Sequence, residues 1–317
     1  MNRYIVRRLI LAVPTLIGAS IVIFTLMRIV PGDVASLIVS GDAAFADPVA
    51  VAKVRQQFGL DQPLIKQYGS WVWKLLHGDL GESYWHKKRI NDFIGGRITI
   101  SLQLAIMATL VGVLISVPSG ILSAIFQDTW LDYIVRMLSL AFLSIPHFWL
   151  GIMIILILIQ LFSWSPSVKW VDFMEDPVGN LKITVWPAFV VGSGLGAVLS
   201  RLMRSSMLEV LRQDYVRTAR SKGLVERVVL LRHCLKNAAL PYVTFAGLSF
   251  ALLMGGLLTT ERVFNIPGMG SFLVTGLLNR DYPMVQSLVV TFTFTLIVIN
   301  LAVDMVYSYL DPRIRYS

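Results

Sequence analysis

Long apolar runs, separated by shorter polar segments, dominate the chain. Six of them are long and apolar enough to cross a membrane, since a spanning helix needs about 20 mostly apolar residues rising about 1.5 Å each. The six stretches are 9–29, 99–125, 134–162, 183–203, 238–259 and 284–310. The pattern predicts an all-α polytopic membrane protein with six transmembrane helices.

The fourth stretch, 183–203, is the least apolar of the six. Glycines within 192–196 dilute its hydrophobicity, and Arg201 and Arg204 crowd its end. Small residues let transmembrane helices approach closely, so we still interpret it as a span. No strand pattern precedes the glycines, which argues against a dinucleotide-binding loop. Prolines in or beside the spans predict kinks that are either static or part of a gate, at Pro118, Pro146, Pro187 and Pro241.

Residues 1–30 are expected to be a cytoplasmic end followed by the first span. A cleaved signal peptide is the alternative, because Arg3, Arg7 and Arg8 precede the apolar core. That core runs on to Met27, beyond the 7 to 15 residues typical of a signal, and no clear cleavage site follows it. The segment is therefore interpreted as an uncleaved anchor.

Composition narrows the class of protein. Of 317 residues, 56% are hydrophobic and 15% charged, whereas about a quarter is charged in soluble domains. Cys234 is the only cysteine, which excludes an internal disulfide and a cysteine-based zinc site. The four histidines lack metal-ligand spacing, and no GxxxxGK[ST] phosphate loop occurs. We expect no metal, no cofactor and no ATP site on this chain.

The net charge of +9 would suit a nucleic-acid partner, but the basic residues follow membrane topology instead. Nine Lys and Arg residues lie in 201–236, whereas 163–182 and 260–283 hold two each. The positive-inside rule therefore places both termini, including the tail 311–317, and the 201–236 loop in the cytoplasm. No nucleic-acid partner is expected.

Residues 31–97 are predicted to form a small external (periplasmic) helical domain between the first two spans. Asp47 and Pro48 have the signature of a helix start, Gly59 that of a stop, and Asp61 with Pro63 that of a second start. An apolar cluster follows that suits a docking face, or an amphipathic helix that either lies on the bilayer or packs on the spans. It consists of Trp71, Trp73, Leu75 and Leu76.

Asn300 and Asp304 share one face of the last span by their spacing. An intramembrane carboxylate suggests a functional role, but Asp304 lies near enough to the cytoplasmic end to pair with a basic residue there, and we favour that pairing.

The segment 204–237 is the most informative part of the chain. Asp214 is predicted to cap a helix over 215–222, with Gly223 in a left-handed turn. Leu224, Val228, Leu231 and Leu235 recur with helical spacing, which predicts one apolar face of a second helix. The result would be a basic helix and turn projecting between the fourth and fifth spans, although an ordinary solvated basic loop is an alternative.

The sequence DYVRTARSKGLVERVVLLRHCLKNAALP, residues 214–241, resembles the cytoplasmic coupling (EAA) loop of ABC importer permeases. Arg217, Thr218 and Ala219 stand where the general motif has Glu-Ala-Ala, and Pro241 lies farther from Gly223 than usual. Both departures are typical of the dipeptide, oligopeptide and nickel permease branch, which also includes glutathione permeases. The segments RYIVRRLILAVPTLIG, FGLDQPLIKQY, GDLGES, ERVFNIPGMG and NLAVDMVYSYLDPRIRY extend the resemblance over nearly the whole chain.

The resemblance implies the type I ABC importer permease fold over 98–310, with a coupling loop at 204–237. It implies ATPase contacts through that loop, in which Ala219 would be small because it meets the partner, and a loop-to-helix motif. The residues implied are Asp214, Tyr215, Arg217, Thr218, Ala219, Arg220, Lys222, Gly223 and Leu224 for the loop, and His233, Asn237 and Pro241 for the motif.

The resemblance also implies partners: a second permease, two ATPase subunits that bind ATP and magnesium, an external binding protein, and membrane lipid. The expected location is the bacterial cytoplasmic (inner) membrane. Peptides, glutathione and nickel all remain open as the solute. An ion-coupled carrier acting alone is the alternative function, and a non-transporting scaffold is a third.

Overall fold

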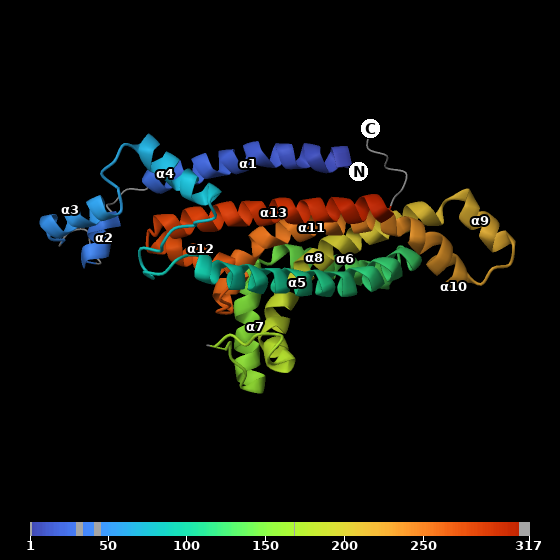
Figure 1. Ribbon diagram of the computed structural model, residues 1–317. Helices are drawn as coiled ribbons and strands as arrows, with labels where there is room; N and C mark the ends of the chain where they lie inside the picture. Colours follow the sequence, from blue (N-terminus) through green and yellow to red (C-terminus); the bar gives the residue numbers. More distant parts are fainter. Residues whose placement is uncertain (1, 30–33, 41–45, 168, 311–317) are drawn as a thin grey trace. The chain divides into compact units, whose positions relative to one another are not determined.

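The computed structural model describes residues 2–29, 34–40, 46–167 and 169–310, without the side chains of residues 2–7, 9, 40, 256, 304 and 306–310. Every element in these ranges is helical, apart from one isolated bridge between Glu82 and Arg89 (Figure 1). The all-α prediction is confirmed. The chain divides into two compact units, Met1–Thr99 with Ser271–Val298 and Ile100–Gly270 with Ile299–Ser317.

Among the described residues, 5 helical segments are long and apolar enough to cross a membrane. They lie in α1 (Asn2–Ile29), α5 (Asn91–Ile125), α8 (Pro177–Leu211), α11 (Lys236–Val263) with the residues before it, and α13 (Tyr282–Leu310). A sixth candidate exists only as a bent pair, α6 (Trp130–Ser144) and α7 (His147–Phe162), whose axes differ by 101°. The stretch 134–162, predicted as a single span, is therefore broken in the middle.

Pro146 causes this break. A proline ring disfavours helical backbone at the residue before it, and Ile145 is accordingly extended, with φ −82° and ψ 123°. Pro146 (φ −60°, ψ 134°) then stands directly before α7, where its missing N–H costs nothing. Of the four prolines, Pro146 is the one at which a helix is interrupted. The other three lie inside α5, α8 and α11, at Pro118, Pro187 and Pro241.

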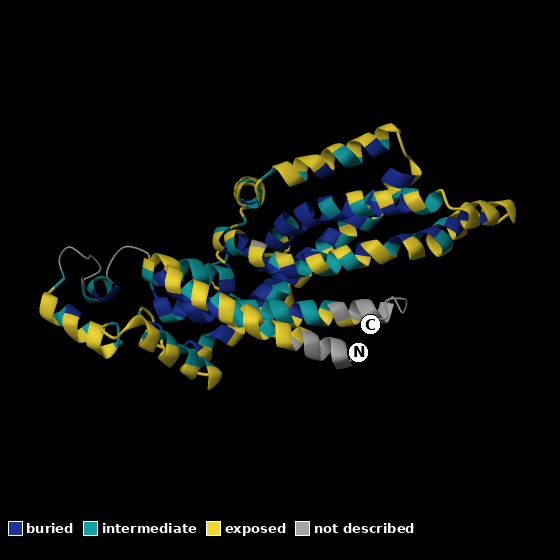
Figure 2. Cartoon of the chain, turned by 90° about the horizontal axis from the view of Figure 1, so that it is seen from above, coloured by how far each residue is buried: buried dark blue, intermediate teal, exposed yellow. Residues whose placement is uncertain are grey.

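Helix α8 is the core of the unit Ile100–Gly270. In its most apolar window 72% of the residues are buried, against 17 to 39% in the other four segments. Figure 2 colours the buried residues dark blue. Its small residues allow this, because a Cβ added at Gly192 would lie 2.5 Å from the carbonyl oxygen of Ala108 in α5. A Cβ added at Gly120 of α5 would lie 2.6 Å from Cβ of Met203. The stretch with the weakest apolar signal is thus the most enclosed, because glycine permits close helix packing.

Three short helices follow α1 in the other unit: α2 (Val34–Ser40), α3 (Pro48–Gln57) and α4 (Leu64–Leu76). The predicted start of α3 is confirmed, since the backbone N–H of Val49 donates to Asp47 Oδ1 at 3.1 Å. The predicted stop is also confirmed, because Gly59 has φ +64° and α3 ends just before it.

The predicted start of α4 is only partly right. Pro63 is the residue before the first turn, but no side chain caps the helix, so Asp61 is not its cap. The apolar cluster on α4 divides by exposure: Trp73 and Leu76 are 65% and 75% exposed, whereas Trp71 and Leu75 are half-buried. The remaining helix, α12 (Met269–Leu278), leads through a turn into α13.

Candidate functional site

A short helical hairpin joins α8 to α11. It consists of α9 (Asp214–Ser221), α10 (Glu226–Val228) and the π-helix η1 (Val229–Leu235), and it extends beyond the ends of α8 and α11 (Figure 1). Its first helix begins one residue earlier than predicted. Gln213 is the extended residue before it, no side chain caps it, and Asp214 is the first helical residue. The prediction that Asp214 caps the helix is wrong, although its carboxylate still suits the positive end of the helix dipole.

Gly223 ends α9, as predicted. Its φ is +76°, a value that favours glycine. Its N–H donates to the carbonyl of Arg220 at 2.9 Å, and the N–H of Leu224 donates to the carbonyl of Ala219 at 3.4 Å. This is a Schellman ending, in which Lys222 is the last half-helical residue. Bonds within the chain alone therefore fix the direction of the turn.

The predicted apolar face of the second helix is wrong. Leu224, Val228 and Leu231 are 41%, 40% and 52% exposed. The buried residues are Val229 and Cys234, which are five apart. The physical reason is the π-helix, whose i→i+5 hydrogen bonds bring residues at that spacing onto one face, whereas the prediction assumed the α-helical period.

The inner face of α9 packs on the chain's own core. Val216 is fully buried and Ala219 is 6% exposed. Both belong to a cluster with Met207 of α8 and with Val229 and Cys234 of η1. The idea that Ala219 is small because it meets a partner is therefore wrong: it is small because it fits this internal contact.

The outer face of α9 carries the polar residues predicted for the site. Asp214, Tyr215, Arg217, Thr218, Arg220 and Lys222 are all exposed. Arg220 reaches across the Gly223 turn to Glu226, with Nη2 2.7 Å from Oε1 and Nε 3.1 Å from Oε2. This hydrogen-bonded pair raises the pKa of Arg220, but both side chains are about half exposed, so the pair adds little stability.

The predicted loop-to-helix residues are brought only partly together. Asn237 Nδ2 donates to Tyr215 Oη at 3.0 Å and to the carbonyl of His233 at 2.9 Å. Tyr215 and Asn237 thus link α9 to the start of α11. Pro241 lies one turn farther along α11 and is exposed.

A buried ion pair that the sequence did not reveal lies next to this hairpin's base. Asp132 of α6 is 0% exposed and accepts from Arg204 Nε at 2.8 Å and Arg204 Nη2 at 2.7 Å. Ser123 Oγ donates to the same carboxylate at 2.5 Å, and the N–H of Asp128 donates at 3.1 Å. Arg136 lies 3.6 Å away. The ends of α5 and α6 are therefore fixed to α8, the helix that leads into α9.

The segment 261–270, one of those that carry the resemblance, is organised around a second buried carboxylate. Ser101 Oγ donates to Glu261 Oε1 at 2.5 Å and accepts from the N–H of Met269 at 2.9 Å. A Cβ at Gly268 would collide with the Glu261 carboxylate. The glycine therefore leaves room for a contact that ties the end of α11 to α5.

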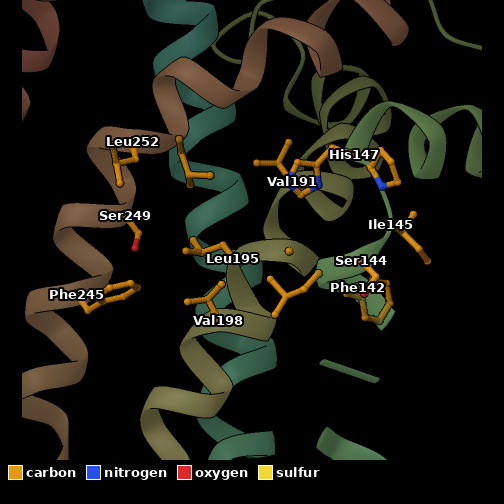
Figure 3. A pocket seen from close by; sticks show the side chains of 14 residues that line it. Phe142, Ser144, Ile145, His147, Val191, Leu195, Val198, Phe245, Ser249 and Leu252 are labelled. Atoms are coloured by element: carbon orange, nitrogen blue, oxygen red, sulfur yellow. The ribbon is translucent and has the colours of Figure 1, made fainter. Parts of the chain in front are cut away.

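A hollow of about 590 Å³ lies at the break between α6 and α7, against α8 and α11. Figure 3 shows its wall, which is apolar except for Ser144, Ser249 and His147. The His147 imidazole packs against Gly194, and its buried Nδ1 has no hydrogen-bond partner in the part of the chain that the structure describes. A side chain at position 194 would collide with the imidazole ring, so glycine leaves the space that the ring occupies.

No group of three or more His, Cys, Asp or Glu side chains in the described ranges could hold a metal ion. The Asp304 side chain lies outside the part of the chain that the structure describes, so its expected pairing stays a prediction, while Asn300 is half-buried.

Two family descriptions match the sequence. Residues 116–316 match the binding-protein-dependent transport system inner membrane component, and residues 1–105 match the N-terminal part of such membrane components.

Several proteins match over their full length, with 100% of each chain covered. A protein of Brucella abortus (strain 2308), provisionally named a peptide transport system permease protein, is 38% identical over 317 residues. The dipeptide transport system permease protein of Alkalihalophilus pseudofirmus is 36% identical over 337 residues. The glutathione transport system permease protein of Escherichia coli O6:H1 is 36% identical over 320 residues.

A crystal structure of an amino acid ABC transporter with histidines also matches. Its TM-score is 0.51 at 12% identity, and the match covers 71% of this chain and 95% of that chain. At this identity the likeness concerns the fold alone, and it confirms the predicted permease fold.

Proposed function

The chain belongs to the family of binding-protein-dependent transport system inner membrane components, and from this premise we propose that α9 and the Gly223 turn are where ATPase subunits act on it. The chain is a permease subunit of an ABC importer, a transport subunit of the inner membrane and not an enzyme. Nothing in the family or the fold favours the alternative of an ion-coupled carrier acting alone.

The observation that carries the coupling proposal is the two-sided character of α9. Val216 and Ala219 on one side are buried in the core formed with α8 and η1, so α9 cannot move without those helices. Arg217 and Lys222 on the other side are exposed, with no partner within the described chain. A rigidly held helix with a free basic face is suited to receive force from a partner surface.

The same reasoning extends the proposal to the assembly. Binding-protein-dependent import requires an ATPase and an external binding protein, and we propose two ATPase subunits, which would hold the ATP and magnesium, and a second permease. The nine basic residues in 201–236 support a cytoplasmic position for α9 and for both termini. The segment 31–97 would then face the periplasm.

We propose a peptide-class solute. Relatives similar over their whole length carry the names of peptide, dipeptide and glutathione permeases. The hollow beside the α6–α7 break would border the path, since non-helical backbone within a membrane protein is tolerated where it lies against protein or lines a cavity. Its two serine hydroxyls and one imidazole would offer hydrogen bonds within an apolar wall.

The test of the coupling proposal reverses one charge on the outer face of α9. Arg217→Glu should weaken uptake by the complete importer at least about tenfold and reduce co-purification of the ATPase subunits, because a misplaced charge at an interface costs several kcal/mol. Permease abundance should stay unchanged, since the side chain is exposed.

The matched control is Arg232→Glu, which reverses an exposed arginine on η1 instead of α9. It should leave uptake and co-purification near wild type. Equal losses in both variants would mean that general charge matters and α9 is not the contact. Wild-type behaviour of Arg217→Glu would remove the outer face of α9 from the coupling mechanism.

A further inference from the structure

A polar hollow of about 490 Å³ lies in the unit formed by Met1–Thr99 and Ser271–Val298. Its wall comes from the end of α1, the turn between α3 and α4, one side of α4, the segment 79–84 and the start of α13. The volume falls in the range of small-molecule sites, about 300 to 1,000 Å³. Neither the coupling segment nor the hollow at the α6–α7 break includes any of these residues.

The charges around this hollow are of both signs. Arg28 is half-buried, and its partners within the described ranges are neutral: it donates to Gln67 Oε1 at 2.9 and 3.3 Å and lies 3.5 Å from the centre of the Phe24 ring. Lys74, Asp79 and Glu82 also line the hollow, and all three are exposed. One cation is thus set into the wall, while a second cation and two carboxylates lie at more open positions.

Two hydrogen-bond donors in the same wall have no partner among the described residues. The indole Nε1 of Trp71 and the amide Nε2 of Gln286 are both buried and unbonded, although both residues line the hollow. A buried donor without an acceptor carries the full cost of its desolvation. A ligand that supplied an acceptor would recover that cost after a small rotation of the indole and the amide.

Other polar groups of the wall, among them Gln67, Tyr84 and Tyr282, are neutral. Tyr84 is half-buried, and burial raises the pKa of its hydroxyl above the usual range, so that it can donate a hydrogen bond but adds no negative charge. Asp79 is held in place, because its Oδ1 accepts from the N–H of Gly81 at 2.9 Å. The inner wall is therefore rich in donors, and the carboxylates are confined to the open side.

We propose that this hollow binds a short zwitterionic peptide by its two charged ends. Arg28, Trp71 and Gln286 would receive the carboxylate, and Asp79 and Glu82 would receive the ammonium group. The carboxylates at the open side disfavour a purely anionic ligand such as phosphate or an acidic lipid headgroup, whereas a zwitterion brings its own cation to them. This proposal rests on the proposed function and adds an entry site to it.

The binding test uses the complete permease and ATPase assembly in lipid nanodiscs, without the binding protein. A single reporter cysteine replaces Ser70, an exposed residue of the wall, and Ile65→Cys on the same helix is the control outside it. Cys234 is buried and is replaced by serine in both. Tri-alanine at about ten times its dissociation constant should slow maleimide labelling at position 70 about tenfold and leave position 65 unchanged.

Two blocked peptides then test the two ends. The C-terminal amide of tri-alanine and its N-acetyl form should each protect at least about tenfold less, because each lacks one of the two charges. Sodium phosphate and vesicles of phosphatidylglycerol serve as purely anionic probes and should not protect. Equal protection by the blocked peptides, or better protection by either anionic probe, would overturn the proposal.

Side-chain variants separate binding from folding. Trp71→Phe and Gln286→Leu remove donors that have no partner, so neither should lower the melting temperature of the assembly, yet each should weaken protection by tri-alanine about tenfold. Trp73→Phe removes an exposed indole outside the hollow, and it should change neither the melting temperature nor the protection by tri-alanine. If Trp71→Phe and Trp73→Phe behave alike, the hollow is not the site.

Uptake by the complete importer with its binding protein distinguishes failure of the entry site from failure of the proposed peptide-class solute. If labelled tri-alanine is imported but never protects position 70, the entry site is wrong and the proposed function stands. If the importer carries no peptide at all, the peptide-class solute proposed above is wrong.

Discussion

Asp132 and Asp281, which are buried carboxylates in different compact units, are satisfied in different ways. Asp132 is 0% exposed and is bonded to a guanidinium, that of Arg204, through both of its oxygens. Asp281 is 1% exposed, and all of its hydrogen-bond donors within the described ranges are neutral. These donors are Ser83 Oγ at 2.5 Å, the N–H groups of Tyr84 and Trp85 at 3.2 Å each, and the N–H of Met284 at 3.3 Å.

The two arrangements should respond differently when one of their hydrogen bonds is lost. Asp132 also accepts from Ser123 Oγ and from the N–H of Asp128, but it is the Arg204 guanidinium that bonds both of its oxygens. The bond between α6 and α8 is therefore strong only while both charges are present. Asp281 spreads its attraction over four neutral donors, three of them in the segment 83–85, and so fixes that loop to the start of α13 without a counter-ion. We expect the first arrangement to fail abruptly and the second to weaken gradually.

The largest expected effect comes from Asp132→Ala. It leaves the Arg204 guanidinium, whose side chain is only 19% exposed, without its counter-charge, and breaking a buried pair in this way costs about 3–5 kcal/mol. The measurement is the detergent-induced unfolding of the purified permease complex. Uptake should fall as well, because α8 leads directly into α9.

A second substitution tests the cause. In Asp132→Ala combined with Arg204→Met, the buried guanidinium is also removed. Arg136 loses the same carboxylate, but its side chain is 40% exposed, so a large part of the lost stability should return. If the double variant is as unstable as the sum of the two single ones, the pair is not what joins α6 to α8, and the contrast with Asp281 loses its basis.

The helices could be predicted from the sequence because apolar length decides them. The six apolar stretches reappear as helices, and the local signals at Asp47, Gly59 and Gly223 were sufficient because each depends on one residue and its neighbours. The break at Pro146 was predicted only as a kink. Whether a proline bends a helix or ends one depends on what the two halves pack against, which sequence pattern does not contain.

The site was predicted less completely, again because sequence pattern does not contain tertiary packing. The position of α9 and its turn followed from local pattern and resemblance. The π-helix did not, because the prediction assumed the α-helical period, and the i→i+5 bonds put Val229 and Cys234 on the buried face instead. The pairing of Asp132 with Arg204 joins residues 72 positions apart, and no single-sequence signal specifies such a pair. An acidic residue at the start of an apolar helix was the one available hint.

The next effect concerns the second carboxylate. Asp281→Asn keeps one acceptor oxygen but turns the other into a donor that faces donors, so it should cost about 1–3 kcal/mol, less than Asp132→Ala. Hydrogen exchange at the amides of Tyr84 and Trp85 should accelerate, since these N–H groups bond the carboxylate. A loss as large as that of Asp132→Ala would show that four neutral donors are no more tolerant than one guanidinium.

The smallest effects come from matched serines, each of which donates to one of the carboxylates at 2.5 Å. Within the described residues, the Ser123 hydroxyl bonds Asp132 and no other group. The Ser83 hydroxyl donates to Asp281 and also accepts from the N–H of His86 at 2.9 Å. Ser123→Ala should cost about 0.5–1.5 kcal/mol, because the guanidinium still satisfies the carboxylate. Ser83→Ala breaks two bonds and should cost about 1–3 kcal/mol.

Of the two carboxylate variants, the one at Asp132 should cost more stability, whereas of the two serine variants the one at Ser83, next to Asp281, should cost more. This reversal makes the comparison specific. If the stability of each network followed from the burial of its carboxylate alone, the two serines would be equivalent, since both lie at 0 to 1% exposure. If it follows from how the bonds are shared, loss of Ser83 should also speed exchange at the His86 amide, and loss of Ser123 should leave the amide of Asp128 protected. Equal unfolding midpoints for the two variants, with unchanged exchange at both amides, would contradict the distinction drawn between a concentrated and a distributed network.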